Sequence, residues 1–297
     1  MTFHDPAGLL ESLWDPPAGR KVWDRLASAS QTSAETLASS PDHGRAVLNF
    51  LTFSPASLAK ICRRPELLEW LSHNDVQNPK PTSQSNWCSD RSDKDLSFRH
   101  LRLWKSQEML RIAFREISGF AGFAETTRDI TTVAERCVSE VYATCFENLA
   151  KRWGRPKTGF GILAMGKFGG IELNYSSDID VVFFYGEGGY LNPRFSYREF
   201  FTRLAEKIIQ IFSAIAEPLF RIDVRLRPEG AHGPLVRPLA SMENYYAGYG
   251  ENWERMALIK ARGVPAIVNC STSLTSDCSR LFFRGPFPPI SWMKSQH

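Results

Sequence analysis

The stretch SSDIDVVFFY, residues 176–185, constrains the fold more than any other part of the chain. Its apolar run is typical of a buried β-strand, and Asp178 and Asp180 stand two positions apart at its start. Side chains at positions i and i+2 of a strand point to the same face, so these two carboxylates converge. Carboxylates held that close repel each other unless a positive group lies between them. The pattern therefore predicts an arginine, a proton or a metal ion at this point.

The composition fits a soluble globular protein with one large domain or two ordinary ones. Of its 297 residues, 43% are hydrophobic and 23% are charged, and the net charge is +4. No Lys/Arg block resembles a nucleic-acid tail, and no apolar run approaches the ~20 residues needed to span a bilayer. The six cysteines form no CxxC pair and are expected to be free. Without a secretory signal pattern, we expect a cytoplasmic protein with no nucleic-acid or membrane partner.

Three regions can be distinguished along the chain. Residues 1–130 are predicted to be a helical N-terminal region, interrupted by an exposed mobile loop at 77–95 that is rich in Pro, Ser, Asn and Asp. The helix expected after this loop would present its basic residues to solvent. Residues 131–262 carry mixed helix and strand patterns. Residues 263–297 show no sustained periodicity and are expected to be a divergent tail.

The region 131–262 alternates between helical and strand periods. Thr132 and Glu135 fit a capping box at the start of a helix that Gly154 would end. The further elements expected are a strand at 160–165, a glycine-rich turn at 166–170, a strand at 179–185, a helix at about 200–215, a strand at 220–227 and two helices at about 241–262. The last of these strands, FRIDVRLR, alternates apolar side chains with one aspartate and three arginines.

A third carboxylate makes a cation site plausible. Asp223 lies on the polar face of the strand at 220–227, where sheet pairing can bring it beside Asp178 and Asp180. Three carboxylates on one face suit a hard cation such as Mg²⁺, which prefers oxygen ligands and also binds substrate phosphates. Two such ions can clamp the attacking and leaving oxygens of a nucleotidyl transfer. The alternative is a surface set of ion pairs between the aspartates and neighbouring arginines.

The glycine-rich turn GKFGG adds groups that bind phosphates, because its glycines let backbone N–H groups approach closely. The candidate phosphate contacts from the turn and from the later strand are Gly166, Lys167, Gly169, Gly170, Arg221, Arg225 and Arg227. Taken alone, a DxD pair or a glycine-rich turn is more often an ordinary loop. Their order along the chain favours a metal-dependent phosphate site: strand, turn, DxD strand, and then a lone aspartate on a later strand.

The motif GKFGGIELNYSSDIDVVFFY resembles the signature of DNA-polymerase-β-type nucleotidyltransferases. A closer resemblance is to the first nucleotidyltransferase half of the glutamine synthetase adenylyltransferase/adenylyl-removing enzyme family. It is also carried by LRLWKSQEMLRIAFREISG, REFFTRLAEKIIQ, RIDVRLRPEGAHGPLV and ENWERMALIKAR, and covers roughly residues 45–262. The resemblance implies an α+β (mixed α/β) fold, in which a helical N-terminal region precedes a polymerase-β-like catalytic domain. That domain would have a small mixed sheet flanked by helices.

The same resemblance implies roles for individual residues. Asp178, Asp180 and Asp223 would be catalytic and would bind Mg²⁺, as two ions. The nucleotide and its phosphates would be bound by Gly166, Lys167, Gly169, Gly170, Ser177, Arg225 and Arg227. Glu172 and Asn174 would hold the ligand-binding residues in position without contacting the nucleotide themselves.

The family's first half removes AMP from a tyrosine of glutamine synthetase by phosphorolysis and releases ADP, and a PII signalling protein and glutamine set the direction. The resemblance therefore implies adenylyl removal. The partners it implies are adenylylated glutamine synthetase, a PII protein, nucleotide (ADP or ATP) and inorganic phosphate.

Two other functions stay open at this point. The same three carboxylates would serve the transfer of AMP from ATP onto glutamine synthetase or another target. The tail at 263–297 departs from the family pattern, as a truncated or frameshifted end would, and this also fits an inactive binding module. A nucleic-acid polymerase is disfavoured, because no basic stripe is interleaved with aromatic residues.

Overall fold

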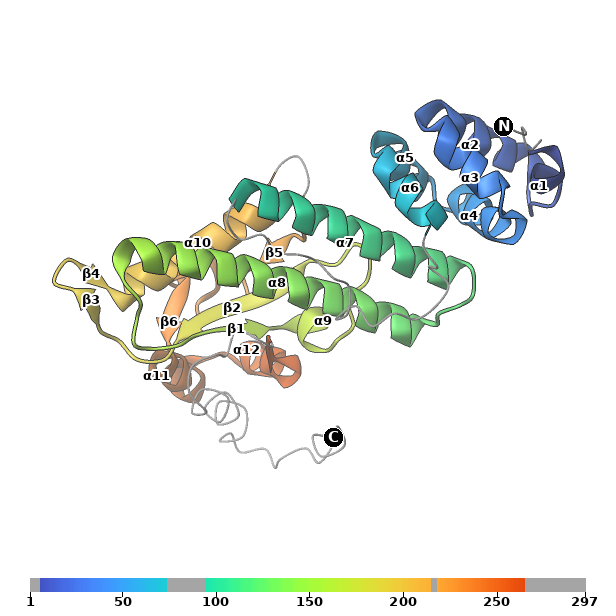
Figure 1. The fold of residues 1–297 in the computed structure, drawn as a ribbon. Coiled ribbons are helices and arrows are strands. Elements are labelled where there is room, and N and C mark those ends of the chain that lie inside the picture. The colour runs from blue at the N-terminus through green and yellow to red at the C-terminus, as the bar shows by residue number, and fades with distance from the viewer. Residues whose placement is uncertain (1–5, 74–93, 215–217, 265–297) are drawn as a thin grey trace, which may run out of the picture. The chain divides into compact units, whose positions relative to one another are not determined.

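The computed structural model describes residues 6–73, 94–214 and 218–264, and the chain divides into two compact units (Figure 1). One unit comprises residues 1–88 and 103–130, and the other comprises residues 89–102 and 131–297.

Two predicted segments lie largely outside these residues. The loop predicted at 77–95 is described only from residue 94, where a helix begins, and the tail predicted at 263–297 only as far as residue 264. In the described part of the chain, no helix is both long and apolar enough to cross a membrane.

The first unit is helical, as its sequence predicted. Its elements are α1 (Ala7–Glu11), α2 (Pro16–Ala29), α3 (Gln31–Ala38), α4 (Pro41–Phe53), α5 (Pro55–Arg63) and α6 (Pro65–His73), with parts of α7 (Lys94–Ile117) and α8 (Phe123–Trp153). Prolines stand in the first turns of α2, α4 and α5, where a missing N–H costs nothing. A core of leucines and phenylalanines, among them Phe50 and Phe114, is fully buried between the helices.

The prediction that the basic residues of α7 face solvent is wrong in part. Arg111 and Arg115 are buried, with exposures of 3% and 2%. Arg111 binds Glu108 and Asp129, each at 3.0 Å, and Arg115 binds Glu125 at 2.6 Å. The acidic partners compensate the cost of taking the guanidinium groups out of water. These arginines therefore hold α7 to the beginning of α8 instead of facing solvent.

The second unit contains a small mixed sheet, which confirms the α+β fold class. β2 (Ile179–Tyr185) is antiparallel to β1 (Phe160–Ala164) and parallel to both β5 (Ile222–Asp223) and β6 (Val236–Pro238). The short strand β7 (Arg262–Gly263) pairs with the other edge of β1. A separate hairpin is formed by β3 (Tyr190–Asn192) and β4 (Phe195–Ser196). The predicted strands at 160–165 and 179–185 are thus confirmed.

Helices cover both faces of this sheet (Figure 1). On one face, Phe160 stacks on Tyr142 of α8 and on Phe201 of α10 (Tyr197–Phe212). On the other face, residues of β1 and β2 pack against α11 (Leu239–Asn244) and the π-helical turn η3 (Tyr245–Tyr249). Because both faces are buried, β1 and β2 are nearly continuous apolar runs.

Local capping signals explain the helix ends. Ser196 and Glu199 form a capping box at the start of α10, and Gly154 follows α8 with a φ of 98°. The capping box predicted at Thr132 is wrong, because α8 begins at Phe123 and Glu135 forms an ion pair with Arg262.

The strand predicted at 220–227 shortens to the two residues of β5. The Asp223 carboxylate accepts the backbone N–H of Arg225 at 2.8 Å, and residues 225 and 226 form a turn. An aspartate that bonds to the backbone two residues ahead offers the chain a turn in place of a ladder hydrogen bond. The alternation of apolar and polar residues therefore continues in the sequence beyond the end of the strand.

The remaining elements follow the sheet. They are the single helical turn α9 (Gly166–Gly169), the 3-10 turns η2 (Gly230–His232) and η4 (Leu258–Lys260), and α12 (Asn252–Ala257). Among the described cysteines, Cys137 and Cys145 are buried, Cys62 is half-buried, and none of the three forms a disulfide, as predicted.

Candidate functional site

The register of the sheet brings the three predicted carboxylates together. In the parallel pairing of β2 and β5, Asp180 lies opposite Asp223, and Ile179 lies opposite Ile222. Paired positions on neighbouring strands share a face, so the side chains of Asp180 and Asp223 project together. Asp178 precedes β2 by one residue and reaches the same side. All three aspartates are only partly exposed.

Two of the three carboxylates are paired with exposed arginines. Arg221 binds Asp178 through two hydrogen bonds, from Nε to Oδ1 at 2.5 Å and from Nη2 to Oδ2 at 2.8 Å. Arg225 binds Asp223 with Nε and Nη2 at 2.8 Å and 2.5 Å from Oδ2. The arginine side chains are 79% and 78% exposed. The ion-pair alternative considered for the sequence is thus present in the structure, on the same aspartates.

Asp180 has a different environment from its neighbours. Burial raises its pKa above the ordinary value, and the nearby charges of Asp223 and Asp178 raise it further. Among the described residues, the structure shows no hydrogen bond or ion pair to its carboxylate. By contrast, the hydrogen bonds from Arg225 lower the pKa of Asp223. The cluster thus contains one carboxylate whose charge is not neutralised by an adjacent partner.

The glycine-rich turn lies directly against the side chain of Asp180. It forms the short helix α9, and Gly166 begins it with a φ of 51°, a conformation that residues with a Cβ rarely adopt. A Cβ on Gly166 would lie 2.6 Å from Oδ2 of Asp180. Lys167 is exposed beside the cluster, and its charge lowers the pKa of Asp180. The turn and the carboxylates are therefore one site.

The C-terminal end of the described chain holds α9 in place, which the sequence interpretation missed. Arg262 donates to the carbonyl oxygens of Phe168 and Gly169, each at 3.3 Å, and Lys260 pairs with Glu172 at 2.8 Å. A Cβ on Gly169 would lie 2.1 Å from the carbonyl oxygen of Lys260. The motif ENWERMALIKAR contains both basic residues, and it was the only signal in the sequence that could have pointed to them.

A polar turn positions the start of β2. Asn174 Oδ1 accepts hydrogen bonds from the hydroxyl of Ser177 at 2.8 Å and from the backbone N–H of Ser176 at 3.2 Å. The backbone N–H of Asn174 in turn donates to the Ser177 hydroxyl at 3.1 Å. These hydrogen bonds fix the backbone immediately before Asp178. The Ser177 hydroxyl is therefore used within its own turn.

Arg227 is anchored differently from Arg221 and Arg225. Its guanidinium donates to the carbonyl oxygens of Val224 at 2.8 Å, Ala231 at 3.0 Å and Gly233 at 3.1 Å. It is half-buried, and burial lowers its pKa. These contacts fold the segment after β5 back on itself, and they place Arg227 in the scaffold of the loop.

The donor chemistry of the site fits a divalent cation. Carboxylate oxygens are the ligands that Mg²⁺ prefers, and a cation would relieve the repulsion that raises the pKa of Asp180. Within the described residues, no three His, Cys, Asp or Glu side chains already converge as a metal-binding group. Two of the carboxylates form ion pairs with arginines in this arrangement.

The comparison with known families agrees with this geometry. The family described as "Glutamate-ammonia ligase adenylyltransferase" matches residues 44–274, which include the sheet, α9 and all three aspartates. The chain belongs to this family.

Individual relatives in the family have the name "Bifunctional glutamine synthetase adenylyltransferase/adenylyl-removing enzyme". The one from Thioalkalivibrio sulfidiphilus is 39% identical over 218 residues, which are 68% of this chain and 22% of the relative. The one from Pseudomonas aeruginosa is 37% identical over 67% of this chain and 22% of the relative. The one from Hahella chejuensis is 32% identical over 90% of this chain and 29% of the relative. The chain thus spans less than a third of the length of these family members.

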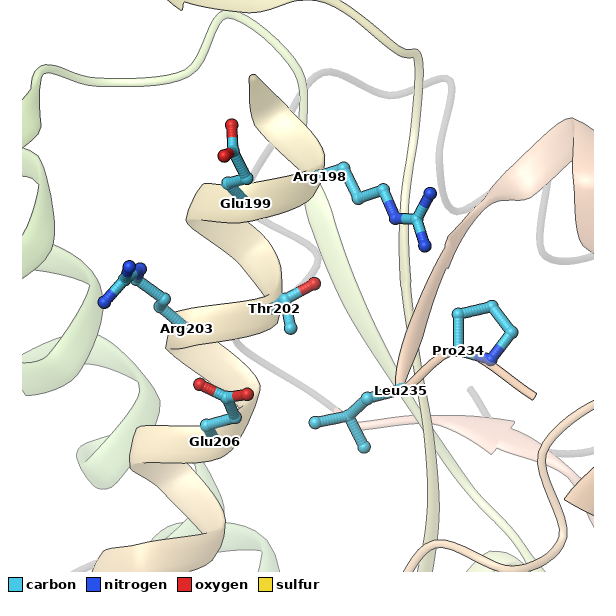
Figure 2. A pocket seen from close by; sticks show the side chains of 7 residues that line it. All are labelled: Arg198, Glu199, Thr202, Arg203, Glu206, Pro234 and Leu235. Atoms are coloured by element: carbon cyan, nitrogen blue, oxygen red, sulfur yellow. The ribbon is translucent and has the colours of Figure 1, made fainter. Parts of the chain in front are cut away.

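A shallow hollow of about 490 Å³ lies elsewhere on the second unit (Figure 2). It is lined by Arg198, Glu199, Thr202, Arg203 and Glu206 of α10 and by Pro234 and Leu235 before β6. None of the predicted site residues lines it. Glu199 is held in the capping box, and the guanidinium of Arg203 lies over the ring of Trp153 at 4.9 Å. The hollow is therefore not part of the carboxylate site.

Proposed function

We propose that this chain removes the adenylyl group from the modified tyrosine of glutamine synthetase, using inorganic phosphate and releasing ADP. The in-register pair of Asp180 and Asp223, with Asp178 beside it and Gly166 against it, is the observation that carries the proposal. Membership of the adenylyltransferase family supports the choice of substrate. Adenylylated glutamine synthetase is the partner in this proposal, and a PII protein is the candidate regulator.

The three aspartates would hold Mg²⁺, as two ions. When bound, these ions neutralise charge on the phosphate oxygens and on the leaving oxygen. Asp223 orients the attacking phosphate, and the backbone of the turn at 166–170 supports the AMP phosphate. An oxygen of inorganic phosphate forms a bond to phosphorus as the bond to the tyrosine oxygen breaks. The products are ADP and unmodified tyrosine, which takes up the proton that the phosphate loses.

Positioning supplies most of the catalysis in such reactions, because the phosphoryl group itself needs little covalent assistance. Packing and polar contacts in the structure hold the strands and the turn that carry the site residues, and this supports a positioning role. β1 and β2 are buried on both faces, and Arg262 and Lys260 hold α9. Exposed Lys167 can contact phosphate oxygens without disturbing this frame.

The test is ADP release from adenylylated glutamine synthetase in the presence of phosphate and Mg²⁺. We expect release by the wild-type chain and its loss in the double variant Asp178→Asn/Asp180→Asn. Arg198→Gln, in the separate hollow, is the matched control and should keep the activity. ADP release that persists in the double variant would contradict the assignment of these aspartates.

A second candidate function is transfer of AMP from ATP to glutamine synthetase. The relatives' name joins both activities, and the same three carboxylates would serve either direction. Labelling of unmodified glutamine synthetase from ATP, without ADP release from the modified form, would favour this candidate. Absence of both activities in a folded chain would favour an inactive binding module.

A further inference from the structure

We propose that Arg221 and Arg225 are exchangeable counter-ions, which pair with Asp178 and Asp223 until a divalent cation binds and then turn to the phosphate oxygens of the nucleotide. The inference rests on the proposed function and adds a role for two arginines on the same site. It separates them from Arg227, which stays in the scaffold.

The two arginines occupy the carboxylate oxygens that a cation needs. Both oxygens of Asp178 accept hydrogen bonds from Arg221. Both oxygens of Asp223 accept hydrogen bonds from Arg225, whose backbone N–H also donates to Oδ1. A carboxylate has about four lone-pair sites, and these bonds use those that face the arginines. A cation that binds both aspartates must therefore compete with the two guanidinium groups.

Arg221 and Arg225 can leave their carboxylates easily. Their side chains are 79% and 78% exposed, so water can replace the carboxylate as a partner. Ion pairs this exposed stabilise an arrangement only by a factor of about two to five. Arg227 provides the contrast, because three carbonyl oxygens hold it within its loop. Arg221 and Arg225 can exchange partners, whereas Arg227 cannot do so without unfolding the loop.

A divalent cation can replace the positive charge of the two arginines. Three carboxylates face two guanidinium groups, and within the described part of the chain Asp180 is the carboxylate without a hydrogen-bonded partner. One divalent cation brings the same positive charge as the two arginines together. Its arrival lets both arginines leave without increasing the negative charge of the cluster. Guanidinium groups bind phosphate oxygens through two parallel hydrogen bonds, so an incoming nucleotide offers the released arginines a matching partner.

The experiment measures metal and nucleotide binding separately by isothermal titration calorimetry. Mn²⁺ alone is titrated into the metal-free chain, and ADP is then titrated in the presence of saturating Mn²⁺. The variants are Arg221→Gln and Arg225→Gln, and the control is Arg198→Gln, an exposed arginine of α10 outside the cluster. Circular dichroism checks that each variant is folded.

Opposite changes in the two affinities are expected. Affinity for Mn²⁺ should rise by about two- to fivefold in each variant, because a competing ion pair is removed. Affinity for ADP should fall by about tenfold or more, because a charge-assisted hydrogen bond to phosphate is lost. The control should change neither affinity.

Several results would overturn the inference. If the affinity for Mn²⁺ stays the same or falls in both variants, the arginines do not compete with the cation and have only a structural role. If the affinity for ADP is unchanged, the arginines do not bind the phosphate oxygens of the nucleotide. If wild-type chain binds Mn²⁺ and releases ADP while these variants behave like the control, only the counter-ion inference fails. If wild-type chain binds no Mn²⁺ but releases ADP, only the counter-ion inference fails. If it also releases no ADP, the proposed function fails with it.

Discussion

The backbone of Gly166 lies so close to the carboxylate of Asp180 that a side chain at position 166 would collide with it. Gly166 has a φ of 51°, and a Cβ there would meet the Asp180 carboxylate at 2.6 Å. The glycine is needed for its conformation and also for the space it leaves. The sequence indicated a phosphate-binding turn, but not that the turn would lie against this aspartate.

Replacement of this glycine should harm stability and activity together. We expect Gly166→Ala to destabilise the fold by about 1–3 kcal/mol, because alanine is strained at this φ. It should also abolish most ADP release by displacing Asp180. Urea unfolding and the ADP assay measure the two effects. Gly188→Ala is the control, since a Cβ there meets nothing within 4 Å and should leave both unchanged.

Asp180 should show a conflict between stability and function. Its pKa is raised by burial and by the two neighbouring carboxylates, so the ionised form destabilises the metal-free fold. The folded state binds the proton more tightly than the unfolded state, and stability falls as the pH rises from the ordinary carboxyl pKa through the raised pKa of Asp180. Asp180→Asn should therefore be at least as stable as wild type at neutral pH in EDTA, yet inactive. A clear loss of stability in urea unfolding would contradict this reasoning.

At the scale of elements, the N-terminal cap of α10 contains a carboxyl group, that of Glu199, whose ionisation affects the stability of the helix. Glu199 accepts hydrogen bonds from the backbone N–H and the hydroxyl of Ser196, each at 2.8 Å, and these bonds lower its pKa. They favour the ionised form in the folded state. The cap therefore contributes stability above the ordinary carboxyl pKa, and that contribution is lost as the pH falls through the lowered value.

This cap can be tested by the pH dependence of unfolding. Glu199→Gln keeps an acceptor at the same position but does not titrate. As the pH falls below the ordinary carboxyl pKa and through the lowered pKa of Glu199, we expect the free energy of unfolding to depend less on pH in Glu199→Gln than in wild type. Thermal or urea unfolding monitored by circular dichroism measures the difference. Identical pH profiles would show that the cap contributes nothing measurable.

At the scale of the whole molecule, the two longest helices contribute to both compact units. The buried ion pairs of Arg111 hold α7 to α8 within the first unit. Replacement of Arg111 takes the paired guanidinium away from the carboxylates of Glu108 and Asp129, which are 9% and 22% exposed, and loss of one partner from a buried ionic set is costly. These ion pairs therefore contribute to the stability of the first unit.

Arg111→Met should lower the free energy of unfolding by about 3–5 kcal/mol. Arg45→Met, which breaks the exposed pair with Asp42, is the matched control and should cost about 1 kcal/mol or less. Urea denaturation of both variants measures the contrast. Equal effects would mean that burial does not set the importance of these pairs.

Much of the second unit could be predicted because its signals are local. β1 and β2 appear in the sequence as short apolar runs, and α10 follows a helical hydrophobic period. The pair of Asp178 and Asp180 on one face follows from the two-residue repeat of a strand. The end of β5 was missed because a side chain, the Asp223 carboxylate, took the backbone N–H that a longer strand would need.

The sequence alone determined the strand–turn–strand order and the residue types of the site, because each depends on neighbours a few positions apart, while the α+β class was implied by the family resemblance. Tertiary structure decided which groups meet. Asp180 faces Asp223 through strand pairing, Arg221 reaches Asp178, and Arg262 holds α9 across more than ninety positions. Such contacts arise from register and packing between distant segments, and no local period encodes them.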